Sequence, residues 1–241
     1  MLIHQYNNSN YRWCFGYFCI ICFFLLQSCV TNNDIQDKFN NINTGIDVSH
    51  HQGAIDWSLV ATDTTVGFVY IKATEGATYV DPMYHEYIEG AKKTGLLVGS
   101  YHFFRMTSTP QTQFANYKQN VDKNIQDLIP MVDVETTDNH NVSELQQNLQ
   151  VFIDSIVACY GVRPMIYGTN RSYNQYLAPK FNDYLLYIGR YGENAPVILG
   201  DGEYTIWQYS ESEKITGIER KVDKCIFHRN HSLSDIMMPA K

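Results

Sequence analysis

VGFVYIKATEGATYVDPMYHEYIEGAKKTGLLVGSYHFF, residues 66–104, contains the pattern that decides the fold class. Its first part, 66–73, is rich in β-branched and aromatic residues, as buried strands are. Residues 82–95 then carry apolar side chains at helical spacing and stop at Gly95, a residue type that commonly ends a helix. A second strand-like run covers 96–104. The stretch therefore predicts a strand–helix–strand unit with two parallel strands and a right-handed crossover.

The same alternation continues toward the C-terminus. We expect a helix to begin at Thr109, with Pro110 at its first position, and to run to about residue 125. Ser143 opens a capping-box pattern, SELQ, before a second helix that ends at Gly161. A first short strand is expected from residue 45 to Asp47, a short helix over 171–178, and further strands over 127–135, 163–168, 184–191, 203–210 and 221–227. The last two of these strands are joined by a loop or a hairpin.

Repeated strand–helix units predict a parallel sheet. About eight strands in one domain-sized chain favour a closed α/β barrel, with helices missing near the C-terminal end. An open, doubly wound sheet is the alternative. No GxGxxG or GxxxxGK[ST] motif follows any expected strand, so the sequence gives no support for a nucleotide cofactor, and no cofactor is expected.

The composition narrows the class of protein. The 241 residues carry a net charge of -7, with 44% hydrophobic and 18% charged residues, which is typical of a globular protein. An acidic chain lacks the basic face that nucleic-acid binding needs. His50 and His51 are adjacent, and adjacent side chains of a strand point in opposite directions, so they do not form a metal site together. No GxSxG motif supports a serine nucleophile.

The N-terminus carries a separate signal over residues 1–28. Arg12 is followed by an apolar run over 13–26, which is short for a membrane-spanning helix but suits the hydrophobic region of a secretory signal. Ser28 and Cys29 then end an LQSC sequence that resembles a bacterial lipobox, in which the cysteine carries lipid. The expectation is a lipoprotein held in the bacterial cell envelope, facing the periplasm, in an outer membrane or at the surface. An uncleaved membrane anchor is the alternative.

The remaining chain divides into a tether and one domain. Residues 29–44 are expected to comprise the lipidated cysteine and a polar, asparagine-rich tether, and 45–241 are expected to form one domain. Cys159 and Cys225 either form one disulfide in an oxidising compartment or remain as two buried thiols. A monomer is expected.

Polar side chains recur where the expected strands end. The carboxyl ends of barrel strands form one rim, where active sites are built. Packing alone does not explain polar residues at nearly every such position, so the sequence predicts a functional site there. The residues concerned are Asp47, Glu75, Tyr101, His102, Asp133, Glu135, Tyr167, Arg190, Trp207, Gln208 and, in the last strand, Asp223.

Asp133 and Glu135 are the most informative of these residues. Their i, i+2 spacing places both carboxylates on one face of a strand, with Cα atoms about 6.5–7 Å apart. Two neighbouring carboxylates with unequal burial have pKa values that are pushed apart, so one holds a proton while the other is ionised. Cleavage of a glycosidic bond needs such a pair. The alternative is two acids in a solvated loop.

Aromatic residues near the same rim favour a sugar substrate, because they offer flat apolar faces with polar handles. Tyr101 and Trp207 are the two that we favour individually as site residues. His50 is expected to support the neighbouring loop and to contact substrate. The full set of aromatic candidates is Tyr70, Tyr101, Phe103, Tyr167, Trp207 and Tyr209.

Six motifs, in this order and spacing, resemble glycoside hydrolase family 25, the lysozymes of the Chalaropsis type: DVSHHQG, YIKATEG, GSYHFF, VDVE, IYG and IWQYS. The resemblance covers about residues 45–230. It implies a modified, TIM-like α/β barrel of one domain, with five strand–helix units followed by three strands. It also implies N-acetylmuramidase activity, which cuts the β-1,4 bond between N-acetylmuramic acid and N-acetylglucosamine in the peptidoglycan glycan strand.

The resemblance also implies roles for residues. Glu135 matches the general acid and Asp133 the second acid of the family's DxE motif, while Asp47 and Asp223 match the aspartates of the first and last strands. Asp133 then either acts as the nucleophile or steadies the substrate's own acetamido group, and we prefer the second mechanism. The sugar subsites would be lined by Tyr101, Tyr167 and Trp207, with Gln208, Glu75, Tyr70, His102, Arg190 and His50 as further substrate-binding residues.

Two other functions remain open. The first is a peptidoglycan-binding lipoprotein that has lost catalysis, although a lectin needs no DxE pair. The second is a hydrolase of another acetamido glycan such as chitin, although chitinases of similar architecture usually show a longer DxxDxDxE run, which is absent here. The run KCIFHRN after Asp223 departs from the family's usual sequence and leaves the local structure of the last strand open.

Overall fold

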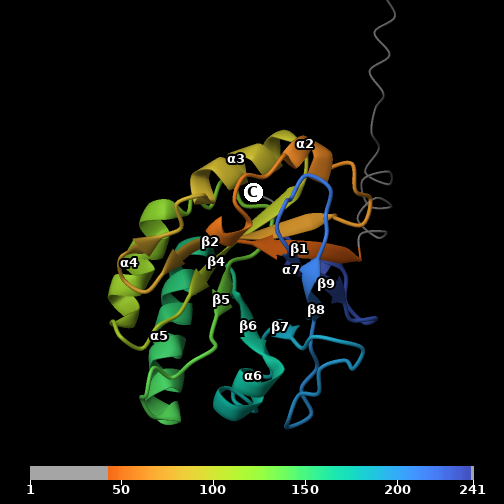
Figure 1. Cartoon of the computed structure of the whole chain (residues 1–241). Coiled ribbons are helices and arrows are strands. Elements are labelled where there is room, and N and C mark those ends of the chain that lie inside the picture. The colour runs from red at the N-terminus through yellow and green to blue at the C-terminus, as the bar shows by residue number, and fades with distance from the viewer. Residues whose placement is uncertain (1–42, 240–241) are drawn as a thin grey trace, which may run out of the picture.

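Eight strands close into a barrel in the computed structural model, which describes residues 43–239 (Figure 1). The predicted signal segment over 1–28 and nearly all of the predicted tether lie outside the described residues. The strands are β1 (Thr44–Val48), β2 (Phe68–Glu75), β3 (Tyr79–Val80), β4 (Leu97–Phe103), β5 (Met131–Asp133), β6 (Met165–Thr169), β7 (Leu186–Gly189), β8 (Ile206–Glu213) and β9 (Val222–Phe227).

The strand order is β1-β9-β8-β7-β6-β5-β4-β2, and a parallel pairing of β1 with β2 closes the ring. Six pairs of barrel strands are parallel: β1–β2, β2–β4, β4–β5, β5–β6, β6–β7 and β7–β8. Strand β9 is antiparallel to both of its neighbours, β8 and β1. The two-residue strand β3 lies outside the ring and pairs with β2 alone. The closed barrel confirms the predicted fold class and rules out the open, doubly wound sheet.

Helices cover the outside of the barrel, so that α3 to α6 surround the strands in Figure 1. Each of the first five barrel strands is followed by one α-helix, and the last three strands follow with only a single helical turn at the end, which matches the predicted arrangement. The helices are η1 (His50–Gln52, a 3-10 turn), α2 (Trp57–Val60), α3 (Tyr84–Lys93), α4 (Pro110–Asn120), α5 (Val142–Tyr160), α6 (Asn170–Tyr176) and α7 (Leu233–Ile236).

Several boundaries differ from the sequence predictions by a few residues, among them those of α4 and α5. Helix α4 ends at Asn120 rather than near residue 125. Asn141, not Ser143, caps α5, because the Asn141 side chain accepts a hydrogen bond from the backbone N–H of Glu144 at 2.8 Å. Asparagine is as good an N-cap as serine, and the capping-box pattern pointed to the wrong one of two suitable residues.

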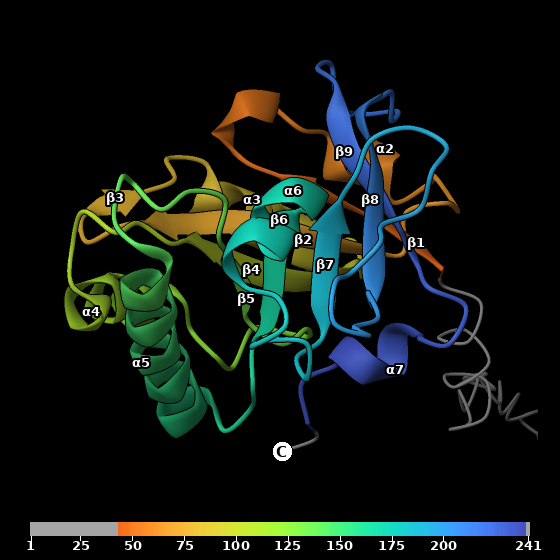
Figure 2. The same cartoon turned by 90° about the horizontal axis from the view of Figure 1, so that it is seen from below.

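Alternate residues of each strand face the lumen of the barrel or the helices outside it. On β2, Val69 and Ile71 pack against the helices, whereas Phe68 and Tyr70 belong to a second buried cluster inside the barrel. Helix α7 contributes to this inner cluster and lies near the ends of β7 and β8 in Figure 2. The lumen is therefore filled by side chains at that end.

The cysteines of the described chain do not pair. Cys159 on α5 and Cys225 on β9 are both free thiols, and Cys225 is fully buried in the lumen. The disulfide alternative is therefore wrong, and the two thiols remain. None of the helices between residues 43 and 239 is long and apolar enough to cross a membrane.

Candidate active site

A cavity of about 210 Å³ opens at the end of the lumen that faces away from the apolar filling. It lies where the carboxyl ends of the parallel strands meet, which is the rim that the sequence predicted. Four carboxylates, five aromatic or apolar side chains and several polar groups surround it. The lining residues are Asp47, Ser49, His51, Lys72, Tyr101, Phe103, Met131, Asp133, Glu135, Tyr167, Tyr191, Gln208 and Asp223.

The reversed direction of β9 explains how the last strand contributes an acid to this rim. Because β9 is antiparallel to β1, its beginning lies beside the end of β1. Asp47 and Asp223 are direct partners in this register. The structure therefore pairs two carboxylates that lie 176 positions apart in the chain.

Asp47 is buried and held by two donors. The Tyr187 hydroxyl donates a hydrogen bond to its Oδ2 at 2.6 Å, and the Gln208 side-chain amide donates to both carboxylate oxygens at 3.1 and 3.0 Å. Gln208 is itself oriented by the Tyr167 hydroxyl, which donates to its Oε1 at 2.8 Å. Burial raises the pKa of Asp47, and these hydrogen bonds oppose that rise. Burial, together with the charge of Asp47, raises the pKa of Asp223 to about 8.

Asp133 ends β5, and Glu135 lies two residues further, on the same side of the chain. Burial raises the pKa of Asp133 well above its usual value, and the charge of Glu135 raises it further. The pKa of Glu135 is also raised, first by burial and then by the charge of Asp47. Asp133 Oδ1 is buried without a hydrogen-bond partner among the described residues. An unpartnered, buried acceptor in a cavity is suited to receive a donor from a ligand.

Lys72 supplies the cation of this site, and the sequence prediction missed it. Its ammonium contacts Glu75 Oε2 at 2.7 Å, and its charge lowers the pKa values of Asp133 and Glu135. Glu75 also contacts the Arg105 guanidinium at 3.4 Å. Glu75, a predicted substrate-binding residue, therefore holds Lys72 beside the DxE pair and does not itself line the cavity. The alternation of β2 could have indicated Lys72, because it follows Phe68 and Tyr70 on the inward face.

Tyr101, Tyr167 and Gln208 line the cavity, as the predicted roles require. His51 and Tyr191 line it as well, and neither was among the predicted site residues. A contact of any of these side chains with substrate stays a prediction.

Besides Glu75, five further predicted substrate-binding residues do not line the cavity. Tyr70 and His102 are completely buried elsewhere. Tyr70 donates to the backbone carbonyl of Ile129 inside the lumen, while His102 stacks on Phe152 outside the barrel, with ring centroids 4.7 Å apart. The structure therefore corrects both roles to packing, because neither side chain reaches the cavity. Burial lowers the pKa of His102 to about 4, so it is neutral at ordinary pH.

Trp207, Arg190 and His50 make contacts beside the cavity rather than within it. The Trp207 indole N–H donates to the backbone carbonyl of Arg190 at 2.7 Å, and the Arg190 guanidinium donates to Ala195 O at 2.6 Å. The His50 imidazole contacts Asp81 at 2.8 Å. These side chains support the loops around the rim, and the predicted direct contacts of all three with substrate in this cavity are not supported.

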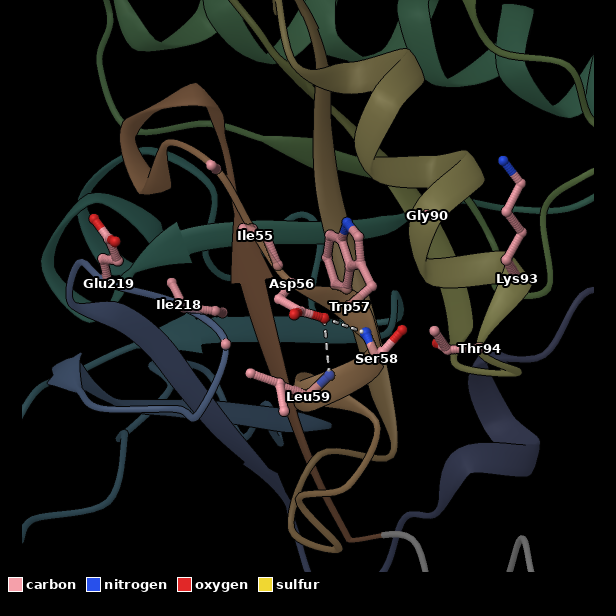
Figure 3. A pocket seen from close by; sticks show the side chains of 12 residues that line it. Ile55, Asp56, Trp57, Ser58, Leu59, Gly90, Lys93, Thr94, Ile218 and Glu219 are labelled. Atoms are coloured by element: carbon pink, nitrogen blue, oxygen red, sulfur yellow. Dashed lines mark hydrogen bonds between the residues drawn. The ribbon is translucent and has the colours of Figure 1, made fainter.

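A larger hollow of about 810 Å³ lies beside Trp57, between α2 and the end of α3 (Figure 3). Its carboxylate, Asp56, accepts hydrogen bonds from the backbone N–H groups of Ser58 and Leu59 and so caps α2. Figure 3 shows Glu219 on the far side of this hollow, away from Asp56. Without two facing acids, the hollow lacks the groups that bond cleavage needs, despite its size.

Within residues 43–239, no group of three or more histidine, cysteine, aspartate or glutamate side chains is placed to hold a metal ion. The cavity itself offers the chemistry of its four carboxylic acids. One acid of the DxE pair can donate a proton while the other stabilises positive charge.

Comparison with known proteins identifies the family. A model of the glycosyl hydrolases family 25 matches residues 46–218, which is most of the chain. The chain belongs to glycosyl hydrolase family 25. This assignment confirms the family resemblance seen in the sequence motifs.

Curated relatives of family 25 support the assignment. The chain is 32% identical over 179 residues to an autolytic lysozyme of Clostridium acetobutylicum, a match that covers 74% of this chain and 54% of the relative. It thus spans about half the length of that protein. It is 30% identical over 203 residues to lysozyme M1 of Streptomyces globisporus, covering 76% of this chain and 67% of that protein.

Solved structures of family 25 share the fold. A bacterial lysozyme from Streptomyces coelicolor superposes with a TM-score of 0.72 at 27% identity, over 80% of this chain and 94% of the other. A family 25 glycosyl hydrolase from Bacillus anthracis gives a TM-score of 0.72 at 30% identity, over 77% of this chain and 88% of the other. The barrel described here is therefore that of a lysozyme-like glycoside hydrolase.

Proposed function

We propose that this protein is an N-acetylmuramidase that hydrolyses the β-1,4 bond between N-acetylmuramic acid and N-acetylglucosamine in peptidoglycan. The observation that carries the proposal is the DxE pair at the cavity, where both Asp133 and Glu135 have raised pKa values. Relatives that are called lysozymes support the choice of substrate.

Glu135 is the general acid in this proposal. It is less buried than Asp133, so it can approach the glycosidic oxygen, and its raised pKa favours the protonated form that a general acid needs. The charge of Lys72 limits that rise. The acid protonates the leaving oxygen while the sugar carbon develops positive charge.

Asp133 steadies the substrate's acetamido group, which attacks the reacting carbon in place of a protein nucleophile. A nucleophilic carboxylate must be ionised, and burial beside Glu135 disfavours the ionised form of Asp133. Its unpartnered Oδ1 can accept a hydrogen bond from an acetamido N–H. Direct attack by Asp133 is the other mechanism.

Asp47 and Asp223 place a second pair of acids opposite the first. Tyr187 and Gln208 donate hydrogen bonds to Asp47, and Asp47 lies directly beside Asp223 in the register of β1 and β9, so the pair is held in place at the cavity. Tyr101 and Tyr167 provide faces for the sugar rings, and both line the cavity. Positive charge that develops on the sugar is stabilised by such an environment.

We further propose that the protein is a monomeric lipoprotein of the bacterial cell envelope, anchored through lipid on Cys29. The LQSC sequence after a short apolar run supports this localisation. The polar segment over 29–44 would let the catalytic domain reach glycan near the membrane. Anchoring raises the effective concentration of enzyme at its substrate without any new contact.

The test compares two glycans. The full chain, solubilised in detergent, is incubated with purified peptidoglycan and, separately, with chitin oligomers, and new reducing ends are counted. Turnover of peptidoglycan with little turnover of chitin is expected. A preference for chitin would identify a hydrolase of another acetamido glycan. Binding to several wall types without any new ends would identify a peptidoglycan-binding lipoprotein and contradict the proposed activity.

A further inference from the structure

A second hollow, of about 850 Å³, lies at the same rim as the candidate active site. It is formed by the ends of β6 and β7, by helix α6 and by the loop that follows β7, which lie side by side in Figure 1. Tyr191 lines both this hollow and the cavity that holds the DxE pair. The two hollows therefore adjoin, and a ligand in the first can extend into the second.

The loop in this hollow is held by asparagine side chains of α6. Asn174 accepts a hydrogen bond from the backbone N–H of Leu199 at 2.9 Å and donates to Val197 O at 2.7 Å. Asn170, one turn earlier, donates to Val197 O at 2.8 Å. The two side-chain amides thus hold the backbone of residues 197–199 against α6.

This conformation presents two aliphatic side chains to solvent. Val197 is 62% exposed and Leu199 is 57% exposed, whereas Ile198 between them is 8% exposed and packs into the core. Both Val197 and Leu199 line the hollow. Large aliphatic side chains that are held out rigidly beside an active site indicate a surface for apolar groups of a ligand.

The charge of the hollow differs from that of the cavity beside it. None of the described residues that line the hollow is acidic, although four carboxylates surround the adjoining cavity. Arg171 lines it, is exposed, and has no ion-pair or hydrogen-bond partner within residues 43–239. Arg190 also lines it, but its guanidinium is held by Ala195 O. A ligand with a carboxylate and small apolar side chains would complement this surface.

We propose that the hollow binds the short peptide that is attached to the lactyl group of muramic acid. Arg171 would pair with a carboxylate of that peptide, and Val197 and Leu199 would contact its methyl side chains. The inference rests on the proposed muramidase function, since it places the muramic acid ring in the cavity beside Tyr191. Where the peptide is attached, the lactyl carboxyl group is an amide, so the sugar rings carry no charge; they favour aromatic faces and fit this hollow less well than a peptide does.

The test uses one glycan with and without its peptides. The full chain acts on soluble glycan strands that carry their peptides and on the same strands after an amidase has removed them, and kcat/KM is measured for both. The wild type should favour the peptide-bearing strands. Arg171→Gln should lower kcat/KM on these strands about two- to fivefold, the range of an exposed ion pair, and should change it less than twofold on stripped strands.

The aliphatic pair is tested in the same way. Val197→Ser combined with Leu199→Ser should lower kcat/KM on peptide-bearing strands about tenfold, because several methyl groups lose their contacts. Stripped strands should again be cut at nearly the wild-type rate. Lys118→Gln on α4 is the matched control for the charge, because Lys118 is also exposed and lies outside the hollow. Thermal melting verifies that each variant is folded.

A binding measurement separates this inference from the proposed function. Glu135→Gln is titrated with a disaccharide–peptide and with the same disaccharide without peptide. Tighter binding of the first, reduced by Arg171→Gln, supports the peptide site even if the wild type cuts neither glycan, in which case only the muramidase proposal fails. Equal turnover and equal binding of the two forms, or equal losses on both in the variants, would overturn the inference and leave the muramidase proposal intact.

Discussion

The two ends of the barrel lumen are formed by the same strands but differ in chemistry. Along β2 the inward-facing residues change from Phe68 through Tyr70 to Lys72. Along β9, which runs in the opposite direction, they change from Phe227 to Asp223. One end is filled by apolar and aromatic side chains and closed by α7, and the other end gathers acids around a cavity.

This difference shows what burial allows at each end. A carboxylate in the filled end would lose its hydration without compensation, which is very costly. At the open end, Asp47 is tolerated because Tyr187 and Gln208 donate to it, and Asp133 is tolerated at the cost of a raised pKa. The open end therefore holds acids whose burial is unfavourable for stability but useful for catalysis, whereas the apolar packing of the filled end stabilises the fold.

Replacing the proposed acid at the open end should have the largest effect. We expect Glu135→Gln to lower kcat on peptidoglycan about 10²–10⁴-fold, the usual contribution of a general acid, while the melting temperature is unchanged or higher. The matched control is Glu144→Gln, because Glu144 is exposed at the start of α5. Reducing-end assays and thermal melts measure both variants. Similar activity of the two variants would show that Glu135 is not the general acid and that the open end does not hold the catalytic acid.

Substitution of two neighbouring tyrosines, Tyr187 and Tyr70, compares the roles of the two ends in activity and stability. The rings of Tyr70 and Tyr187 are in edge-to-face contact, with centroids 6.3 Å apart, but Tyr187 donates to Asp47 and Tyr70 to Ile129 O. Tyr187→Phe should lower kcat/KM about tenfold, equal to about 1.4 kcal/mol, because Asp47 loses its shortest hydrogen bond. Tyr70→Phe should lower the free energy of unfolding by about 0.5–1.5 kcal/mol and leave activity unchanged. Loss of activity in Tyr70→Phe but not in Tyr187→Phe would show that the lumen is not divided into a catalytic end and a stabilising end.

The pH dependence of the free energy of unfolding reports the buried acids at the open end. The raised pKa of Asp223, about 8, means that the folded state binds more protons than the unfolded state between the usual carboxyl pKa and pH 8. The free energy of unfolding therefore falls as pH rises through this range. His102, whose pKa is lowered to about 4, makes stability rise with pH below pH 6.5. The effect of the buried acids is therefore measured separately from that of His102 between pH 6.5 and pH 8.

Melting temperatures measured at pH 6.5 and pH 8 should accordingly show lower stability at pH 8. In Asp223→Asn this slope should be reduced, because Asp47 no longer faces a second acid. The filled end offers the control, since Tyr70→Phe should keep the wild-type slope. A melting temperature that rises from pH 6.5 to pH 8 would contradict the description of the acid end.

Replacing Lys72 should have the smallest effect of these substitutions. Its charge lowers the pKa values of Asp133 and Glu135, so Lys72→Met should raise both. The alkaline limb of the pH–rate profile, which reports loss of the proton from Glu135, should move to higher pH. Lys92→Met is the comparison, because Lys92 pairs with Asp127 at 2.7 Å on the outside of the barrel. An unmoved limb in Lys72→Met would mean that Lys72 does not influence the acid.

Much of the fold could be predicted from the sequence, because local patterns determined it. The stretch over 66–104 shows strand and helix periodicity without interruption, and the structure has β2, α3 and β4 there. The antiparallel direction of β9 was left open between a loop and a hairpin, since it depends on the long connection over 214–221 rather than on a local pattern.

The site was predicted less completely. Residues at strand ends were identified as a group, but adjacent residues of a strand point to opposite sides, so Tyr101 and His102 could not both reach the lumen. The same rule separates Gln208, which lines the cavity, from Trp207, which does not. Tyr187 gives no signal in the sequence, because only the closed barrel brings it to Asp47.

The most direct test of the central claim identifies the bond that the acid end cuts. The full chain is incubated with purified peptidoglycan, and the new reducing ends are identified by mass spectrometry after reduction. The account predicts ends that carry N-acetylmuramic acid. Ends that carry N-acetylglucosamine would show that a different bond is cut and would contradict it.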